Sequence, residues 1–225
     1  MRTYPINLVG LENRCAVVIG GGSVATRKVA SLLQANAQVT VISPEPSPEL
    51  VAQSQAGAIQ LLRRPWTPTD VDDAFLVVAA TNDPDVNRAV ARRVRARGRL
   101  VNVVDDPTLS TFILPAVLRR GDVTIAVSTG GASPALAAWL RCRLETVVGV
   151  EYAALTDALA ALRPLLLAQP TPTRHQLEDD LIQVLERDGA DATRQWALDT
   201  LHELQLNVSP RQSNQPAIDT DDADA

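Results

Sequence analysis

The fold of this chain is decided by the stretch Val17-Val18-Ile19-Gly20-Gly21-Gly22-Ser23-Val24-Ala25. A short apolar run ends there in three glycines, and a helical pattern begins directly afterwards. The apolar positions of that pattern follow the spacing i, i+4, i+7 and i+8, which places them on one face of a helix. They are Ala25, Val29, Leu32 and Leu33. The stretch therefore predicts a buried strand, a glycine turn and an amphipathic helix.

Within this stretch, Gly20, Gly22 and Ala25 match the pattern G-x-G-x-x-[GA] in the strand–turn–helix context that the pattern requires. Gly20 would allow the tight turn, the bare position at Gly22 would let a diphosphate approach, and Ala25 would let the helix lie on the strand. The N–H groups and positive dipole end of the helix would hold the diphosphate. The pattern predicts dinucleotide binding; the alternative is a glycine turn without a ligand.

Four further apolar runs fit the strands of a parallel sheet, at 38–42, 59–62, 75–81 and 100–104. The run at 75–81 has no polar alternation, as expected for a strand covered on both faces. A helix with a valine stripe lies between the last two runs. Its stripe consists of Val86, Val90 and Val94. The sequence therefore predicts the α/β class with a Rossmann-type parallel sheet.

The pattern changes after this sheet. Apolar residues 112–118, a turn and the run 123–128 predict an antiparallel pair, and Ser133-Pro134 opens a helix in the preferred cap order. Helical patterns then cover 151–168, 174–188 and 191–206, with Pro164, Pro170 and Pro172 as interruptions. We expect four parts: a nucleotide-binding domain at 1–112, a small β dimerisation segment at 113–146, a helical domain at 147–206 and a disordered acidic tail at 207–225.

Composition narrows the class of protein. The 225 residues are 46% hydrophobic and 21% charged, with a net charge of −5, and no basic domain suggests nucleic acid as a partner. No apolar run approaches the roughly 20 residues of a membrane span. The first residues carry no signal-peptide core, and Cys15 and Cys142 are too few for a disulfide framework. We therefore expect a cytoplasmic protein without a membrane partner.

Polar residues at the ends of predicted strands are candidates for chemistry, because ligands of open α/β sheets gather at the carboxyl ends of strands. Asp105 directly follows the run 100–104. An aspartate before a proline-containing turn is also a common turn former, so both readings stay open. At the end of 38–42 stands Ser43 where an acidic residue is usual, with Glu45 two positions later. The residues alone leave the choice between NAD and NADP open.

Several segments together resemble the precorrin-2 dehydrogenase/sirohydrochlorin ferrochelatase family, the N-terminal module of siroheme synthases. The resemblance runs over residues 4–146 and is carried by a set of motifs rather than by any single one. The matching segments are Tyr4-Pro5-Ile6, Val18 to Ala25 with Arg27-Lys28, Ala79-Ala80-Thr81-Asn82-Asp83 with Val86-Asn87, Asn102-Val103-Val104-Asp105, Phe112-Ile113-Leu114-Pro115-Ala116, Ala126 to Pro134 and Arg143-Leu144-Glu145.

The resemblance implies an NAD-dependent oxidation of precorrin-2 to sirohydrochlorin. Many members of the family then insert ferrous iron, which is a substrate, to give siroheme. The family also implies a homodimer that pairs through the segment after the nucleotide-binding domain. Two alternatives remain: a dehydrogenase without chelatase activity, and a regulatory module that senses NAD(H) without turnover.

The resemblance further implies roles for individual residues. Asp105 is the catalytic residue for both reactions, and Ser128 lies at the tetrapyrrole site and is phosphorylated in some members. His175 and His202 lie in the helical part, and the sequence holds no cluster of metal ligands. Arg119, Arg120 or Arg141 could bind substrate carboxylates. Motif and resemblance together predict cofactor binding by Gly20, Gly22, Ser23, Val24, Ser43, Pro44, Glu45 and Thr81, and tetrapyrrole binding by Ser128, Gly130 and Gly131.

Overall fold

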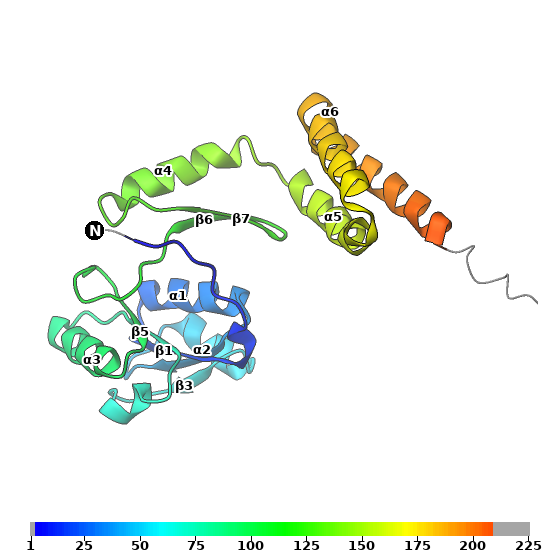
Figure 1. Ribbon diagram of the computed structural model, residues 1–225. Helices are drawn as coiled ribbons and strands as arrows, with labels where there is room; N and C mark the ends of the chain where they lie inside the picture. Colours follow the sequence, from blue (N-terminus) through cyan, green and yellow to red (C-terminus); the bar gives the residue numbers. More distant parts are fainter. Residues whose placement is uncertain (1–2, 209–225) are drawn as a thin grey trace, which may run out of the picture. The chain divides into compact units, whose positions relative to one another are not determined.

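The computed structural model describes residues 3–208. Its centre is one sheet of five parallel strands, paired in the order β3-β2-β1-β4-β5 (Figure 1). The strands are β1 (Cys15–Ile19), β2 (Gln38–Ile42), β3 (Gln60–Leu62), β4 (Leu76–Ala79) and β5 (Leu100–Val103). The predicted α/β class with a Rossmann-type sheet is confirmed.

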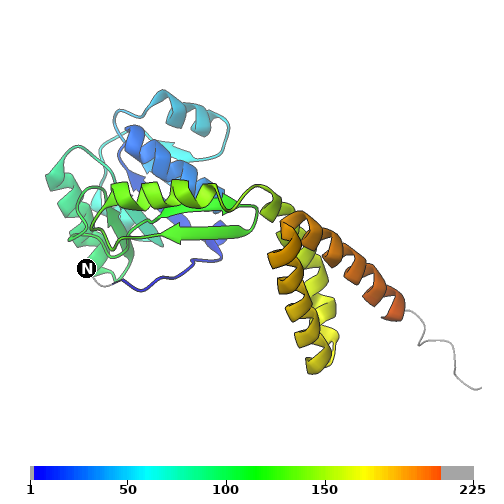
Figure 2. The same ribbon diagram turned by 90° about the horizontal axis from the view of Figure 1, so that it is seen from above.

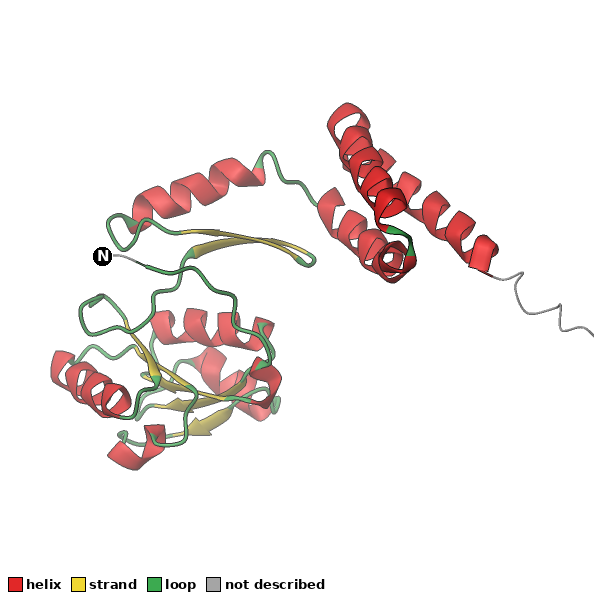
Figure 3. Cartoon of the chain, viewed as in Figure 1, coloured by secondary structure: helices red, strands yellow, loops and turns green. Residues whose placement is uncertain are grey.

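Helices cover both faces of the sheet, so its strands lie between helical layers (Figure 3). On one face, Val29 of α1 and Leu50 of α2 pack with Val18 in a buried cluster. On the other face, Val90 of α3 packs with Val77 of β4. Burial on both faces explains why the strand sequences are continuously apolar. The elements of these layers are α1 (Ser23–Gln34), α2 (Pro48–Gln55), α3 (Pro84–Ala96) and the 3₁₀ helices η1 (Leu11–Asn13) and η2 (Pro68–Val71).

The order of the strands reverses at β1. The chain first builds β2 and β3 on one side of β1, and then crosses to build β4 and β5 on the other side. Loops at the carboxyl ends of β1 and β4 therefore leave the sheet in opposite directions and open a crevice between them. This topology fixes where a ligand can enter before any side chain is considered.

A two-stranded antiparallel sheet follows, formed by β6 (Ala116–Arg120) and β7 (Val123–Val127). The antiparallel pair is confirmed, but the expectation that it begins at Phe112 is wrong. Residues 112–115 form no strand, because the chain there is held against β5: the Asn102 side-chain amide donates a hydrogen bond of 3.1 Å to the carbonyl of Phe112. Phe112, an apolar residue of this run, packs against the buried cluster that contains Val18, Val29 and Leu50.

Three helices complete the described chain: α4 (Pro134–Glu145), α5 (Glu151–Ala168) and α6 (Thr171–Val208). The two predicted helices at 174–188 and 191–206 lie within α6, which breaks at Gly189, where φ is 82° (Figure 2). Pro164 lies inside α5 and does not interrupt it, contrary to expectation. Leu162 of α5 and Ala197 of α6 are fully buried in a shared core.

The chain divides into two compact units. One holds the residues up to Pro115 together with Ser128–Pro134, and the other holds Ala116–Val127 and the residues from Ala135 onward. The predicted domain limits at 112 and 146 remain predictions. The disordered tail expected from residue 207 falls almost entirely on 209–225, outside the described residues, and α6 includes residues 207 and 208. Among the described residues, no helix is long and apolar enough to cross a membrane.

A network of hydrogen bonds fixes the connection between β3 and η2. The Arg64 guanidinium binds both carboxylate oxygens of Asp70, at 2.8 and 2.7 Å, and also donates to the carbonyl of Pro65. Asp70 accepts a further bond of 2.6 Å from the backbone N–H of Thr67, which completes a capping box. The bonds from Arg64 above all, and also those from Thr67, lower the pKa of Asp70 to about 2.

We predict that Asp70→Asn lowers the free energy of unfolding on the order of 1 kcal/mol at pH 7, a modest figure because Arg64 is partly exposed to solvent. Because the pKa in the folded protein lies below the ordinary value of 3.8, the carboxylate stabilises the fold fully above pH 3.8 and loses its effect as the pH falls towards 2. Urea unfolding between pH 7 and pH 2.5 measures the difference from the parent protein.

Asp73→Asn is the control, because Asp73 is exposed and makes no ion pair within residues 3–208. A difference between parent and Asp70→Asn that stays constant from pH 7 to pH 2.5 would contradict the assignment of the stabilisation to the Asp70 carboxylate.

Candidate functional site

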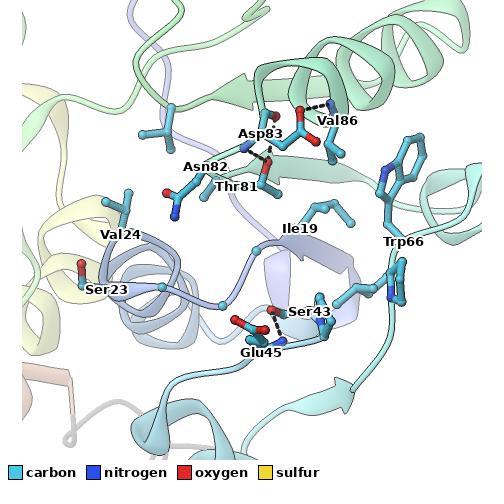
Figure 4. A pocket seen from close by; sticks show the side chains of 18 of the residues that line it. Ile19, Ser23, Val24, Ser43, Glu45, Trp66, Thr81, Asn82, Asp83 and Val86 are labelled. Atoms are coloured by element: carbon cyan, nitrogen blue, oxygen red, sulfur yellow. Dashed lines mark hydrogen bonds between the residues drawn. The ribbon is translucent and has the colours of Figure 1, made fainter.

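A pocket opens at the carboxyl ends of four strands, where the strand order reverses (Figure 4). Most of its lining comes from the ends of these strands and the loops that follow them: Ile19 to Val24 at β1, Ile42 to Glu45 at β2, Ala80 to Asp83 at β4, and Val104 and Asp105 at β5. All eight predicted cofactor-binding residues therefore line one pocket, together with the predicted catalytic residue. They are Gly20, Gly22, Ser23, Val24, Ser43, Pro44, Glu45, Thr81 and Asp105.

Gly20, the first glycine of the loop, lies close to the ends of both strands that neighbour β1. The N–H of Gly20 donates a hydrogen bond of 2.9 Å to the carbonyl of Ile42 in β2. A Cβ atom at Gly20 would lie 2.3 Å from the carbonyl oxygen of Ala80, and φ there is 121°. Any side chain at this position would therefore push the β4 loop away, in a backbone conformation that favours glycine.

The other two glycines face different surroundings. A Cβ at Gly21 would lie 2.4 Å from Ser43 Oγ and 2.6 Å from the carbonyl oxygen of Glu45, so this glycine permits the turn after β2 to pack on the loop. A Cβ at Gly22 would meet nothing within 4 Å. Gly22 thus leaves open space at the start of α1, as the predicted diphosphate site requires.

The N-terminus of α1 is left available by the sequence around it. Its cap residue is Gly22, no side chain caps the first turn, and that turn contains no acidic residue. The first backbone N–H groups of a helix have no partner within the helix, so at an uncapped end they can bind an anion. Ala25, which is fully buried, lets the helix pack closely on the sheet. These features fit a diphosphate at the pocket.

The turn after β2 forms one side of the pocket and is tied to the glycine loop. The N–H of Ser47 donates to the carbonyl of Gly21 at 2.9 Å, and the hydroxyl groups of Ser47 and Thr26 lie 3.0 Å apart. Ser43 is buried, and its hydroxyl accepts a hydrogen bond of 3.2 Å from the N–H of Glu45. The exposed Glu45 carboxylate is therefore the charged group that this side of the pocket offers to a ligand.

Asp105 stands at the opposite side, after β5. Its φ of 64° is left-handed, a conformation that aspartate and asparagine tolerate better than most residues, and its side chain is exposed. Lys28 lies on α1, one turn after Val24, and interacts electrostatically with the Asp105 carboxylate. Burial and the charge of Arg27 lower the pKa of Lys28, whereas the charge of Asp105 raises it. An exposed carboxylate thus lines the pocket, and its charge acts on Lys28, which lies outside the pocket lining.

The predicted tetrapyrrole-binding turn lies outside the pocket lining. Ser128 is exposed, and its hydroxyl accepts a hydrogen bond of 3.2 Å from the N–H of Gly130. The hydroxyl of Thr129 accepts from the N–H of Ser133 at 2.9 Å and donates to its carbonyl at 3.0 Å. Gly130 and Gly131 both have positive φ. The turn belongs to the same compact unit as the pocket, and the ligand role of its residues remains a prediction.

Potential metal ligands are not clustered. Within residues 3–208, no group of three or more histidine, cysteine, aspartate and glutamate side chains is arranged to hold a metal ion. His175 and His202 are exposed on α6.

Reasoning from the sequence missed three contributors: Gly21, Lys28 and Asn87. The signal for Gly21 was the third consecutive glycine, one more than the motif demands. Lys28 and Asn87 stand in segments that carry the family resemblance, but neither was assigned a role from the sequence, because their partners Asp105 and Thr81 are known only from the fold.

Comparison with known proteins supports this reading of the pocket. Residues 8–116 match the NAD_binding_7 family of NAD(P)-binding domains, and residues 120–146 match the family described as sirohaem biosynthesis protein central. These two matches cover the parallel sheet with its pocket, and the region from the end of β6 to α4.

Relatives and a solved structure agree with these matches. The chain is 45% identical to the siroheme synthase of Methylobacillus flagellatus over 163 residues, which are 72% of this chain and 35% of the relative. It is 40% identical to the siroheme synthase of Thioalkalivibrio sulfidiphilus over 210 residues, 89% of this chain and 43% of the relative. The chain therefore spans less than half the length of either relative.

The structure of SirC, a precorrin-2 dehydrogenase, superposes with a TM-score of 0.75 at 27% identity and covers 89% of this chain and all of SirC. Sequence, fold and both family matches thus agree over the pocket and the segment that follows it. The chain belongs to the family formed by the N-terminal modules of siroheme synthases and the precorrin-2 dehydrogenases.

Proposed function

We propose that this protein oxidises precorrin-2 to sirohydrochlorin with NAD as the hydride acceptor. The observation that carries the proposal is the meeting of two features in one pocket: the uncapped start of α1 behind Gly22, and the exposed carboxylate of Asp105. The names of SirC and of the siroheme synthases among the relatives supply the substrate class. When bound, NAD would accept the hydride that leaves the tetrapyrrole.

Residues of the pocket fit NAD from one end to the other. Backbone N–H groups at Ser23 and Val24 would hold the diphosphate, with Gly20 and Gly22 shaping the loop. Ser43, Pro44 and Glu45 would face the adenosine side, where a carboxylate can bind ribose hydroxyl groups and repel a 2′-phosphate. The charge of Glu45 therefore supports NAD over NADP.

Asp105 would act on the tetrapyrrole directly. Dehydrogenation removes a hydride and a proton, and a carboxylate at the nicotinamide end of the pocket can accept that proton, directly or through one water. Asp105 lies two residues after the end of β5, in a left-handed backbone conformation that aspartate tolerates. Ser128, Gly130 and Gly131 would contact the substrate at the mouth of the site.

Insertion of ferrous iron into sirohydrochlorin is the second part of the proposal. Iron displaces two pyrrole protons as it enters the ring, and the Asp105 carboxylate could accept them. A dehydrogenase without this activity is the alternative within the same family. An NAD(H) sensor is less well supported, since a sensor has no use for a proton acceptor beside its cofactor.

We further propose a homodimer that pairs through the segment after the parallel sheet. Leu136, Trp139 and Leu140 form a stripe at i, i+3 and i+4 along α4, and their exposed fractions are 48%, 57% and 36%. Within residues 3–208, the strands β6 and β7 pair only with each other, so each has an open edge there. Native proteins tend to cover such edges and stripes, and a second copy would do so.

Turnover of precorrin-2 tests the main proposal. The parent protein should convert precorrin-2 to sirohydrochlorin only when NAD is present, followed by the absorbance of the product and of NADH. Gly22→Asp should abolish this oxidation, because its carboxylate would repel the diphosphate. Iron insertion into supplied sirohydrochlorin should persist in that variant, since the step needs no hydride acceptor.

Ser31→Asp is the matched control for Gly22→Asp, because it adds the same charge to an exposed position more than two turns along α1. It should leave NAD-dependent turnover unchanged. A folded Gly22→Asp protein that retained the oxidation would exclude the glycine loop as the diphosphate site. A parent protein that oxidised precorrin-2 but inserted no iron would leave only the dehydrogenase.

Asp105→Asn should slow both reactions, by about 100- to 10,000-fold if the carboxylate is the general base. Asparagine tolerates the left-handed backbone, so the variant removes basicity and preserves the turn. The rates of both steps are measured at saturating substrate.

Asp106→Asn is the control. The Asp106 carboxylate accepts hydrogen bonds from the hydroxyl and N–H of Thr108 and lies outside the pocket lining, so its loss should affect stability rather than rate. Near-parental rates in Asp105→Asn would show that Asp105 only forms the turn after β5 and is not the general base.

The dimer is tested by the mass of the protein in solution. Light scattering at micromolar concentration should give twice the mass of one chain, and Trp139→Glu should shift it towards that of one chain because it places a charge in the stripe. Leu167→Glu, at an exposed apolar position of α5 outside the stripe, should leave the mass unchanged. A monomeric parent protein at that concentration would exclude the pairing.

A further inference from the structure

Three consecutive polar residues follow β4 and form one rim of the pocket: Thr81, Asn82 and Asp83. Their side chains look interchangeable in the sequence, since each can bind a ligand through hydrogen bonds. Two of these side chains hold the loop through hydrogen bonds, whereas the third makes none within residues 3–208.

The polar atoms of Thr81 are taken up inside the protein by Asn87, which is buried. Asn87 Oδ1 accepts from the Thr81 N–H at 3.2 Å and lies 2.8 Å from its hydroxyl, and Asn87 Nδ2 donates to the Thr81 carbonyl at 3.0 Å. The hydroxyl also accepts from the N–H of Asp83 at 3.2 Å. Thr81 is thus a structural member of the loop, locked by a buried carboxamide.

Asp83 also has a structural role, because it caps a helix. Its carboxylate Oδ1 accepts hydrogen bonds from the N–H groups of Asp85 and Val86, at 2.8 and 3.3 Å, and so caps the N-terminus of α3. Pro84 at the first helical position fixes the chain direction directly after this cap. Both bonds of the cap use Oδ1, so the cap sets the orientation of this carboxylate.

Asn82 differs from both neighbours. Its side chain is exposed, and among residues 3–208 it makes no hydrogen bond. Figure 4 shows its carboxamide turned towards Val24 and the start of α1, across the pocket from Ser43 and Glu45. The bonds at Thr81 and Asp83 hold the backbone on both sides of Asn82, so the point from which its carboxamide extends is set before a ligand arrives.

The order of the strands indicates which half of a bound NAD would lie near Asn82. β2 and β4 flank β1 on opposite sides, and the diphosphate would sit between them at the start of α1. With the adenosine half on the β2 side near Glu45, the nicotinamide riboside must lie on the β4 side, where Asn82 and Asp105 stand. We propose that the Asn82 carboxamide binds this half of NAD by hydrogen bonds to the hydroxyl groups of the nicotinamide ribose. The inference rests on the proposed use of NAD.

Calorimetric titration with NAD and with ADP tests this assignment, because ADP lacks the nicotinamide riboside. Asn82→Ala should raise the Kd for NAD by roughly 5- to 10-fold, the effect of losing one or two neutral hydrogen bonds, and should change the Kd for ADP by less than about twofold. Asn82→Ser, which keeps a donor and acceptor on a shorter side chain, should fall between parent and alanine variant. Gln34→Ala removes an exposed carboxamide at the far end of α1 and should change neither constant.

Each remaining result overturns the inference in a recognisable way. An equal loss of NAD and ADP affinity would show that Asn82 acts on the diphosphate or on the loop as a whole. Unchanged NAD affinity in Asn82→Ala would remove the contact. A parent protein that bound neither compound would refute the proposed function itself, and this inference with it. Thermal unfolding confirms that the variants are folded.

Discussion

The close packing of a glycine loop between two strands is the constraint on which the site depends. A side chain at Gly20 would collide with the carbonyl of Ala80, and one at Gly21 would collide with the turn after β2. Without side chains there, the end of β1 touches both neighbours, and α1 begins at the reversal of strand order. The uncapped helix terminus therefore faces the crevice. One steric condition thus creates both the pocket and its anion-binding end.

The loops around this pocket satisfy most of their own polar groups. The Ser43 hydroxyl is hydrogen-bonded to Glu45, the Thr81 hydroxyl to Asn87, and the Asp83 carboxylate to the first turn of α3. Such pairing stiffens the rim and leaves a small number of groups exposed to a ligand, among them the carboxylates of Glu45 and Asp105 and the carboxamide of Asn82. Rigid surroundings with few free groups are what a site needs to orient a cofactor and a proton acceptor together.

Burial differs sharply between the parallel sheet and α4. The parallel sheet has apolar cores on both faces, whereas α4 buries little beyond Ala137 and exposes a stripe that includes Trp139. The first unit has the covered sheet of a complete nucleotide-binding domain. The second presents apolar surface and open strand edges, which is the physical basis for proposing a second copy as its partner.

Sequence alone determined the five parallel strands, the glycine turn and the position of Asp105 after β5, because periodicity and strand ends are local properties. It also indicated the later helices, but not the continuation of α5 through Pro164 or the loop at 112–115, where contacts with β5 override an apolar pattern. Only the tertiary structure separated Asn82 from Thr81. Asn87, six residues after Thr81, binds the polar backbone atoms of Thr81 with its buried side chain, whereas the Asn82 side chain makes no hydrogen bond within residues 3–208.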